Sequence, residues 1–280
     1  MPRLAGVLDE LGDAGVVRYR PGKRCTLRGT TADGDRFVKV GPGADCRHAD
    51  GVALWRAAAD RDLGFDVARP LGLDRTRRAV HQGVVTGSGI MDVLLGGDGH
   101  VCAGRLGIAL GALATSAVRP TATAPPSTQQ SRTRRAARRV VERIPALAVP
   151  VHRLVDELDA CHGRLARRTL VPVHGAPHAE QWLDGDGRLG LVDFDRFALG
   201  EPELDLATFL AELDAEPVAI EAIERSLVEG FRSSGTMLDP VRLDLYRRHK
   251  RLAKVTRTAW SLRPDADERA AQRLAQLLGP

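Results

Sequence analysis

Aromatic residues are scarce in this sequence: phenylalanine, tryptophan and tyrosine together make up 4% of its 280 residues. Proteins that bind single-stranded nucleic acid interleave aromatic and basic side chains, so this scarcity disfavours a nucleic-acid binder. A large excess of one charge is also lacking, because 41 basic residues face 36 acidic ones and leave a net charge of +5. This mild excess fits an anionic ligand and does not by itself indicate nucleic acid.

Cysteine and long apolar runs are equally sparse. The four cysteines, Cys25, Cys46, Cys102 and Cys161, form no CxxC pair, which argues against a disulfide framework or a cysteine metal site and favours buried free thiols in a reducing compartment. The longest apolar stretch, residues 106–118, is shorter than the ~20 residues that span a bilayer. It predicts a buried helix. With no signal peptide evident at the N-terminus, we expect a cytoplasmic protein without a membrane span.

The length is sufficient for one large domain or two lobes. The N-terminal part is rich in strand-like runs, separated by the turn signals Pro21-Gly22-Lys23 and Asp33-Gly34. We predict a short helix over 1–12, a three-stranded meander over 15–20, 24–30 and 35–40, a helix over 49–64, and strands over 67–73 and 79–85. Residues 86–90, "TGSGI", are predicted to be a flexible hinge.

Beyond the hinge the pattern becomes mostly helical. Helices are predicted over 90–96, 103–118, 131–144, 150–168, 203–214, 217–234, 239–262 and 266–278. Residues 119–130 are rich in Pro, Thr and Ser and predict a linker or mobile insertion, while residues 182–194 predict a hairpin with an Asp-Gly-Asp-Gly turn. The pattern indicates an α+β protein with a β-rich N-lobe (1–85), a hinge (86–90) and a larger helical C-lobe (91–280); an unspecified α+β fold remains the alternative.

Two motifs in the C-lobe, "HGAPHAEQ" (174–181) and "LGLVDFDRFALGEPELDLA" (189–207), carry a family resemblance. They are similar to the catalytic region of aminoglycoside phosphotransferases and choline kinases, including related bacterial sugar and maltose kinases. In that family a loop reads His-Gly-Asp, then four residues, then Asn, and a hairpin leads to an apolar strand that ends in an acidic residue. The resemblance implies a bilobal protein-kinase-like fold with its catalytic-like loop at 173–195.

The resemblance implies that the protein uses ATP or GTP together with Mg²⁺. Lys39, in the third predicted strand, would contact the α- and β-phosphates and pair with a carboxylate of the following helix. Asp50 is the best candidate for that carboxylate, and Asp45 is the other. Lys23 and Arg24, in the turn "RPGKR", could approach the phosphates, although a simple hairpin turn is an equally good interpretation.

The same resemblance assigns the metal and loop positions. Asp193 would hold magnesium on the β- and γ-phosphates, and Asp195 would bind a second metal or orient the loop. Gln181 stands where the family has Asn, and its amide oxygen could still ligate the metal. His174 would support the loop by hydrogen bonding, and Asp205 would cap a helix or support the loop.

Ala176 departs from the family pattern, because it stands where the family has its catalytic aspartate. That carboxylate accepts the proton of the substrate hydroxyl, a contribution of typically ~10²–10⁴-fold in rate. Three explanations stay open: a natural nucleotide-binding pseudokinase, an alternative base such as Glu180, His178 or the substrate itself, or a deliberate Asp-to-Ala replacement. Natural divergence is favoured by the neighbouring Pro177 and Gln181, which also differ from the usual pattern.

Two basic runs, 132–143 and 246–257, predict either solvated helix faces or a surface that binds an anionic or peptide substrate. A basic C-lobe argues against an aminoglycoside as acceptor, since aminoglycosides are polycations. The sequence therefore favours a phosphotransferase that acts on a hydroxyl of a small molecule or biosynthetic peptide. A pseudokinase or scaffold is the alternative, and a nucleic-acid binder using an arginine-rich helix has the least support.

Overall fold

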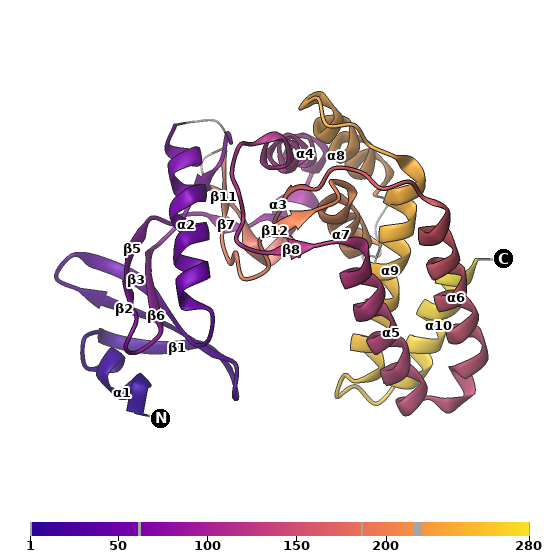
Figure 1. Cartoon of the computed structure of the whole chain (residues 1–280), viewed down its shortest axis with the longest axis horizontal. Helices are drawn as coiled ribbons and strands as arrows, with labels where there is room; N and C mark the ends of the chain where they lie inside the picture. Colours follow the sequence, from indigo (N-terminus) through magenta and orange to yellow (C-terminus); the bar gives the residue numbers. More distant parts are fainter. Residues whose placement is uncertain (1, 61–62, 186, 215–219, 280) are drawn as a thin grey trace.

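A computed structural model describes the chain except residues 1, 61–62, 186, 215–219 and 280. Figure 1 shows two lobes side by side: strands and one long helix on the N-terminal side, and a larger group of helices on the C-terminal side. The α+β organisation predicted from the sequence is therefore present. Within the described residues, no helix combines the length and apolar character that crossing a bilayer requires.

The N-terminal lobe is built on a five-stranded antiparallel sheet in the order β1-β2-β3-β6-β5. The predicted meander forms its first three strands. A short helix, α1, precedes the sheet and a long helix, α2, follows β3. The bounds are α1 Pro2–Leu8, β1 Gly12–Arg20, β2 Arg24–Thr31, β3 Gly34–Val40, α2 Ala44–Ala59, β5 Pro70–Asp74 and β6 Ala79–Gly83.

The alternation of side chains along β3 decides where its lysine points. Val38 and Val40 are buried in the small core of this lobe, together with Val7 and Leu27. Because neighbouring residues of a strand face opposite sides of the sheet, Lys39 emerges on the face away from this core. Its side chain is thereby directed toward residues of the C-terminal lobe.

A second, four-stranded sheet joins the two parts of the chain. Its order is β4-β11-β10-β7, with β4 Asp66–Val67, β7 Ser88–Gly89, β10 Trp182–Gly185 and β11 Arg188–Leu191. The strands β10 and β11 are the predicted hairpin, although residue 186 of its turn lies outside the described residues. The predicted hinge 86–90 contains β7, which pairs with β10, and the first residue of α3. The segment that passes between the lobes is therefore itself hydrogen-bonded to the hairpin.

The C-terminal lobe consists of helices around a small three-stranded sheet, β8-β12-β9. The helices expected from the sequence are present, and the expected positions 61–62 and 217–219 lie outside the described residues. The bounds are α3 Ile90–Leu94, α4 Gly99–Thr115, β8 Thr123–Ala124, α5 Pro126–Arg143, η1 Pro145–Leu147, α6 Ala148–Arg164, β9 Val171–Val173, η2 Ala179–Gln181, β12 Ala198–Gly200, α7 Glu203–Leu213, α8 Glu221–Ser233, α9 Pro240–Ala259 and α10 Ala266–Leu278.

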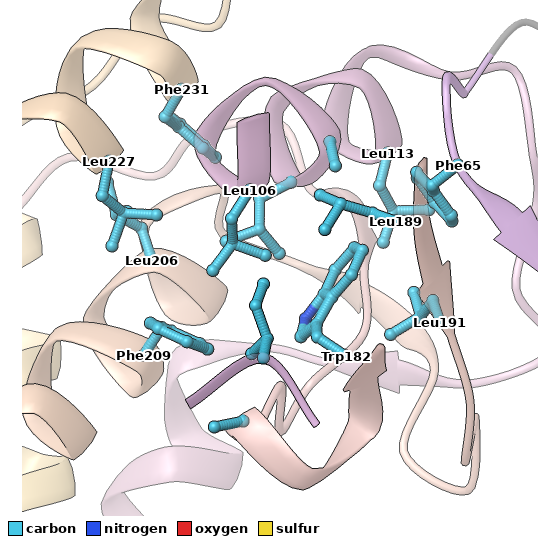
Figure 2. Packing of buried hydrophobic residues seen from close by; sticks show 14 of the residues in the cluster. Phe65, Leu106, Leu113, Trp182, Leu189, Leu191, Leu206, Phe209, Leu227 and Phe231 are labelled. Atoms are coloured by element: carbon cyan, nitrogen blue, oxygen red, sulfur yellow. The ribbon is translucent and has the colours of Figure 1, made fainter. Parts of the chain in front are cut away.

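The main core surrounds the indole of Trp182, which is fully buried (Figure 2). Phe65 meets it edge-on with ring centroids 5.3 Å apart, and Leu106 of α4 packs in the same cluster. The predicted buried helix at 106–118 is confirmed as part of α4. It packs unusually close to α8, since a Cβ added at Gly107 would lie 2.1 Å from the carbonyl oxygen of Leu227. Glycine lets the two helix backbones touch there.

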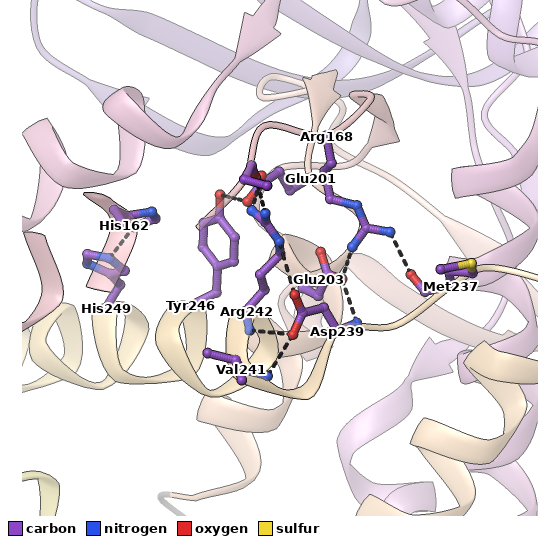
Figure 3. A network of polar contacts seen from close by, with 11 residues as sticks. His162, Arg168, Glu201, Glu203, Met237, Asp239, Val241, Arg242, Tyr246 and His249 are labelled. Atoms are coloured by element: carbon purple, nitrogen blue, oxygen red, sulfur yellow. Dashed lines mark hydrogen bonds and ion pairs between the residues drawn. The ribbon is translucent and has the colours of Figure 1, made fainter. Parts of the chain in front are cut away.

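A buried polar network fixes α9 against the start of α7 (Figure 3). Arg242 forms an ion pair with Glu201, and the hydroxyl of Tyr246 donates a hydrogen bond of 2.8 Å to the same carboxylate. Asp239 caps α9 by accepting hydrogen bonds from the backbone N–H groups of Val241 and Arg242. These contacts hold α9 in one position against the catalytic-like region.

The structure differs from the expectations for two segments and for the burial of two cysteines. Helix α2 begins at Ala44, five residues before the predicted start at 49. Residues 119–130, expected to be a linker or mobile insertion, instead contribute β8, which pairs with β12, and the first turn of α5. All four cysteines are free, as expected, but only Cys25 and Cys102 are buried, whereas Cys161 is half-buried and Cys46 is exposed. Proline at the first position of α5 begins that helix, where its missing N–H is not needed.

Candidate active site

A cleft of about 680 Å³ brings together the turn before β2, the catalytic-like loop and the end of β11. Most of the sequence-predicted site residues line it. They are Lys23, Arg24, His174, Ala176, His178, Glu180, Gln181, Asp193 and Asp195. Lys39 lines a smaller adjoining cavity together with Asp195. The residues expected to act together therefore meet in one region, with the exception of Asp50.

Lys39 reaches across the cleft to the acidic residues at the end of the hairpin. Its Nζ lies 2.8 Å from Oδ1 of Asp193 and 3.6 Å from Oδ1 of Asp195. The side chain of Lys39 is 9% exposed. Burial lowers the pKa of its ammonium, and the negative charge of Asp193 opposes that effect. Lys39 is a buried cation whose principal partner is Asp193.

Arg24 approaches the same two carboxylates from β2. Its guanidinium donates to Oδ1 and Oδ2 of Asp193 at 3.3 and 3.4 Å, and it forms an ion pair with Asp195. Burial alone would raise the pKa of Asp193, but Lys39 and then Arg24 outweigh it and hold that pKa well below the usual range. Lys23, the other basic residue of the turn, lines the cleft and is exposed.

The backbone at Asp193 is strained in a way typical of functional positions. Its φ is +67°, in the left-handed region that few residues other than glycine adopt. Gln181 lies beside it, with Nε2 donating to Oδ2 of Asp193 at 3.4 Å. The amide oxygen of Gln181 instead accepts a hydrogen bond of 3.0 Å from the backbone N–H of His178. Gln181 thus turns its nitrogen, not its oxygen, toward Asp193.

The start of the catalytic-like loop is held by Asp205 from α7. Its carboxylate accepts hydrogen bonds from the backbone N–H groups of His174 and Gly175, at 2.5 and 2.8 Å. Burial raises the pKa of Asp205 to about 6 against the opposing effect of these donors. Gly175 has φ +79°, and an added Cβ would lie 2.3 Å from the carbonyl oxygen of Arg196, so only glycine fits. Asp205 supports the loop rather than lining the cleft.

His174 is fully buried below the loop. Its Nε2 lies 3.3 Å from the carbonyl oxygen of Val192, and burial lowers the pKa of its imidazole to about 4. A neutral imidazole is therefore the stable form at neutral pH. The contact joins the catalytic-like loop to the strand that ends at Asp193.

Ala176 is buried in the wall of the cleft. Apart from Asp193 and Asp195, the acidic residues among the described lining residues of the cleft are Glu180 and Glu212. His178 is half-buried, with Nδ1 3.8 Å from Oε2 of Glu212 on α7. The same carboxylate oxygen accepts a hydrogen bond of 2.8 Å from the backbone N–H of Ala179. Glu180 lines the cleft and is exposed. Glu212 was not singled out from the sequence, because it lies in an ordinary helical run.

The expected partnership of Lys39 with a carboxylate of α2 is corrected by the structure. Asp50 accepts hydrogen bonds from the backbone N–H and the hydroxyl of Thr121, at 2.9 and 3.1 Å. Asp45 forms an ion pair of 3.1 Å with Arg75 at the surface. Asp50 is shorter than the glutamate usual at such positions and lies on a part of α2 that faces the C-lobe, so it anchors residue 121 instead.

The donor atoms fit a metal ion that arrives together with phosphate groups. Within the described part of the chain, no group of three or more His, Cys, Asp or Glu side chains could hold a metal ion alone. Asp193 and Asp195 nevertheless each place a carboxylate oxygen near the Lys39 ammonium, at 2.8 and 3.6 Å. Mg²⁺ is commonly bound by one or two carboxylates, with substrate phosphates and waters completing its shell. This pair meets that requirement.

The sequence analysis did not single out several basic residues that line the site. Arg47 and Arg196 line the cleft, and so does Arg257 of α9. Lys254 and Lys250 lie about one and two turns earlier on α9 and line an adjoining cavity. The spacing of residues 250, 254 and 257 places them on one helix face, which was a usable signal within the basic run 246–257.

The sequence of this chain matches a known protein family. Residues 26–232 match the family model described as the phosphotransferase enzyme family. The chain belongs to this family. The match includes Lys39, the catalytic-like loop and Asp193, whereas no curated protein was found to match the chain.

Solved structures of several kinases and phosphotransferases share the fold. A choline kinase from Streptococcus pneumoniae superimposes with a TM-score of 0.68 at 14% identity, covering 98% of this chain and 96% of that one. An amicoumacin kinase in complex with AMP-PNP, Ca²⁺ and Ami gives 0.72 at 12% identity, covering 99% and 92%. A spectinomycin phosphotransferase in complex with ADP and spectinomycin gives 0.62 at 15% identity, covering 100% and 94%. The predicted bilobal kinase-like fold is confirmed.

Proposed function

We propose that this chain is an ATP- and Mg²⁺-dependent phosphotransferase that acts on a hydroxyl group of a small molecule. The observation that carries the proposal is the convergence of Lys39 with Asp193 and Asp195 beside the catalytic-like loop. Family membership supports the reaction type, and the structural neighbours crystallised with ADP or AMP-PNP support a nucleotide as donor.

Each residue of the convergence has a role that fits its surroundings. Lys39 is the buried cation that would contact the α- and β-phosphates, as the equivalent lysine does in kinases. Asp193 and Asp195 would hold magnesium, which would neutralise charge on the transferred group. Gln181 would have to give up its bond to the His178 N–H to offer an oxygen to that ion, so in the present geometry it orients Asp193.

The proposed transfer forms one bond and breaks one. The acceptor oxygen bonds to the γ-phosphorus, the bond from that phosphorus to the β–γ bridging oxygen breaks, and ADP leaves with the electron pair. The hydroxyl proton must reach a base or water. With alanine at position 176, His178, Glu180 and Glu212 are cleft side chains able to take it, and positioning with charge stabilisation supplies most of the catalysis.

A thermal-shift measurement with ATP and magnesium tests the proposal. Saturating ligand should raise the melting temperature by about 5 °C in the wild type. Lys39→Ala should lose most of this rise, and Asp193→Asn should lose its dependence on magnesium. Asp45→Asn, which changes an exposed acid on α2, is the control and should respond like the wild type. A wild-type protein that is not stabilised by any nucleotide would contradict the proposal.

A nucleotide-binding pseudokinase is the second candidate, and two observations favour it. Ala176 provides no carboxylate at the position of the family's base, and Arg24 contacts both acidic residues that would hold the metal. Formation of ADP separates the two candidates. Nucleotide binding without ADP formation over hours, with acceptors of every charge present, would support the pseudokinase.

A further inference from the structure

A second cavity, of about 260 Å³, adjoins the cleft on the side of α5 and α9. The two cavities share Ala176, His178, Arg196 and Arg257 in their walls. The second cavity therefore opens toward the cleft beside the position where the acceptor hydroxyl has to meet the phosphoryl donor. A molecule seated in it would reach the Lys39–Asp193 region by way of Ala176.

The charge of this cavity is one-sided. Five cationic residues line it, and among its described lining residues there is no carboxylate. They are Arg132 from α5, Arg196 after β11, and Lys250, Lys254 and Arg257 from α9. Asp205, Glu212 and Asp193, which lie outside this lining, offset the charge of the cluster only in part. The remaining positive charge favours an anion that would neutralise it.

The cavity cations differ from other cations on the same two helices. Among the described residues, none of these five side chains has a hydrogen-bond partner or an ion-pair partner within 4.0 Å. Three other arginines on these helices are paired: Arg134 contacts Asp159, Arg247 contacts Asp214 and Glu224, and Arg248 contacts Glu157. Protein carboxylates thus pair with these three arginines outside the cavity and with none of the five cations that line it.

The pKa of Lys250 responds both to its burial and to the neighbouring charges. Burial and then the nearby charge of Arg132 lower the pKa of its ammonium to about 7, with Asp205 opposing and Arg196 and Arg257 adding to the effect. Burial likewise lowers the pKa of Lys254 to about 8. A bound anion would favour the charged form of both lysines, so it would be bound by more charge than the empty cavity carries.

The wall of this cavity also contains a group that can accept a hydrogen bond from a ligand hydroxyl. Gln129 is 5% exposed, and its amide oxygen is buried without a hydrogen-bond partner while its nitrogen donates to Thr133 at 3.4 Å. A buried carbonyl oxygen without a partner is costly, and a ligand hydroxyl or N–H would satisfy it. Thr208 also lines the cavity, with its hydroxyl donating to the carbonyl of Leu204. Its oxygen remains able to accept a second hydrogen bond.

The two helices that carry these groups are tied together by buried hydrogen bonds. Thr133 of α5 lies 2.7 Å from Nδ1 of His249 on α9, and the Thr256 hydroxyl donates to the carbonyl of Ala136 at 3.1 Å. Nε2 of His249 also lies 2.8 Å from Nε2 of His162 on α6, within hydrogen-bond distance (Figure 3). The cations therefore project from a fixed framework, which reduces the entropy lost when a ligand binds.

We propose that this second cavity binds the phosphoryl acceptor and that the acceptor is an anionic polyhydroxy compound, with a phosphate or carboxylate group held by the five cations. The inference rests on the proposed function, because it assigns the substrate class of the same site. The unpartnered oxygen of Gln129 would accept a hydroxyl of the ligand. A cationic acceptor, such as an amino sugar, would be repelled.

The test uses four hexoses that differ mainly in charge: glucose 6-phosphate, gluconate, glucose and glucosamine. Binding is measured by calorimetry with AMP-PNP and magnesium present at saturation, so that phosphate groups cannot enter the donor site. The two anionic probes should bind at least tenfold tighter than glucose, and glucosamine should bind most weakly. The stronger of the two anionic probes identifies phosphate or carboxylate as the preferred group. Equal binding of all four hexoses, or preference for glucosamine, overturns the inference.

Variants locate the binding to the cavity. Arg132→Gln and Lys250→Gln should each weaken the anionic probes about tenfold and leave AMP-PNP affinity unchanged. Arg134→Gln, on the same helix but paired with Asp159 at the surface, is the matched control and should change neither. If Lys250→Gln does not fold, Lys254→Gln, which lines the second cavity and not the cleft, takes its place. Equal losses in Arg132→Gln and Arg134→Gln would place the anion elsewhere and overturn the inference.

The two proposals fail separately. Binding of AMP-PNP without any preference for anionic hexoses overturns the acceptor class and leaves the phosphotransferase proposal intact. Absence of nucleotide binding contradicts the proposed function, and the hexose series measured without nucleotide then still decides whether the cavity selects anions.

Discussion

The ammonium of Lys39 lies 2.8 Å from Oδ1 of Asp193, although 154 positions separate the two residues in the chain. One comes from the central strand of the N-terminal sheet and the other from the end of a hairpin in the C-terminal lobe. Their contact ties the lobes together at the floor of the cleft. It also favours the ionised carboxylate and the charged lysine in a site where burial disfavours both charges.

This pair predicts a measurable coupling in a double-mutant cycle. Lys39→Met and Asp193→Asn should each lower the free energy of unfolding by about 2–4 kcal/mol, because each leaves a buried group without its main partner. The double variant should lose about 1–3 kcal/mol less than the sum of the single losses. Urea unfolding at pH 7.5 measures all four proteins. Additive losses would mean that Arg24 and Asp195, not the Lys39–Asp193 contact, dominate the site.

The position of Ala176 predicts that a carboxylate there would accelerate the chemistry. Ala176 is buried in the wall shared by both cavities, and Arg196 and Arg257 nearby can stabilise a new negative charge. Ala176→Asp should raise the rate of phosphoryl transfer from ATP to water by about 10²-fold, in the range of general-base catalysis. Ala176→Asn has the same size without the basicity and should leave the rate near that of the wild type. Equal rates in both variants would show that another group already takes the proton.

Asp205 should matter for the loop rather than for the nucleotide. Asp205→Asn replaces one of two acceptor oxygens with a donor that faces a backbone N–H, either of His174 or of Gly175. We expect a loss of about 1–3 kcal/mol in the free energy of unfolding at pH 8. Asp244→Asn, an exposed change on α9, is the control for the loss of one negative charge. Unchanged stability in Asp205→Asn would contradict the supporting role.

The contact of Asp50 with Thr121 predicts a separation of stability from nucleotide binding. Asp50→Asn weakens two hydrogen bonds to residue 121 and should lower stability by about 1 kcal/mol. Because Asp50 lies away from Lys39, the affinity for ATP and magnesium should stay within about twofold of the wild type. A large loss of nucleotide affinity in a folded Asp50→Asn protein would restore the pairing first expected from the sequence.

The sequence predicted the fold well because the strongest signals were local. Alternating strand residues with turn glycines indicated β1 to β3, and the two motifs after residue 173 identified the catalytic-like loop and Asp193. The short strands β8, β9 and β12 escaped because two or three residues carry no periodicity. Residues 119–130 were misread because their Pro, Thr and Ser composition is typical of linkers, whereas pairing with β12 is a tertiary contact.

The sequence predicted which residues belong to the site, but not which of their side chains contact one another. Lys39, Asp193 and Gln181 were identified from motifs, yet the pairing of Lys39 with Asp193 in place of Asp50 depends on side-chain geometry. The orientation of the Gln181 amide likewise follows from one backbone N–H of the loop. The cations of α9 were visible as a basic run, but the sequence does not show which of them lack an acidic partner.

The buried histidine His249, which is hydrogen-bonded to His162, predicts that the folded protein loses stability at acidic pH. His249 contacts Thr133 and His162 in the core, and burial lowers the pKa of its imidazole to about 3, with the charges of His162, Lys250 and Arg248 acting in the same direction. The native protein therefore keeps His249 neutral, while the unfolded chain takes up a proton below pH 6.5. The stability that this difference contributes is complete above pH 6.5 and is lost progressively as the pH falls toward 3.

Replacing His249 should remove that part of the pH dependence. Urea unfolding of the wild type and of His249→Gln at pH 7 and pH 5 measures the difference in stability between the two proteins. The wild type should lose about 2 kcal/mol more than His249→Gln between these pH values, since the loss follows the 1.5 pH units by which pH 5 lies below the ordinary histidine pKa. His152→Gln, an exposed histidine on α6, should behave like the wild type. An equal loss in wild type and His249→Gln would mean that the buried imidazole does not govern the acid response, and that the carboxylates of the cleft do.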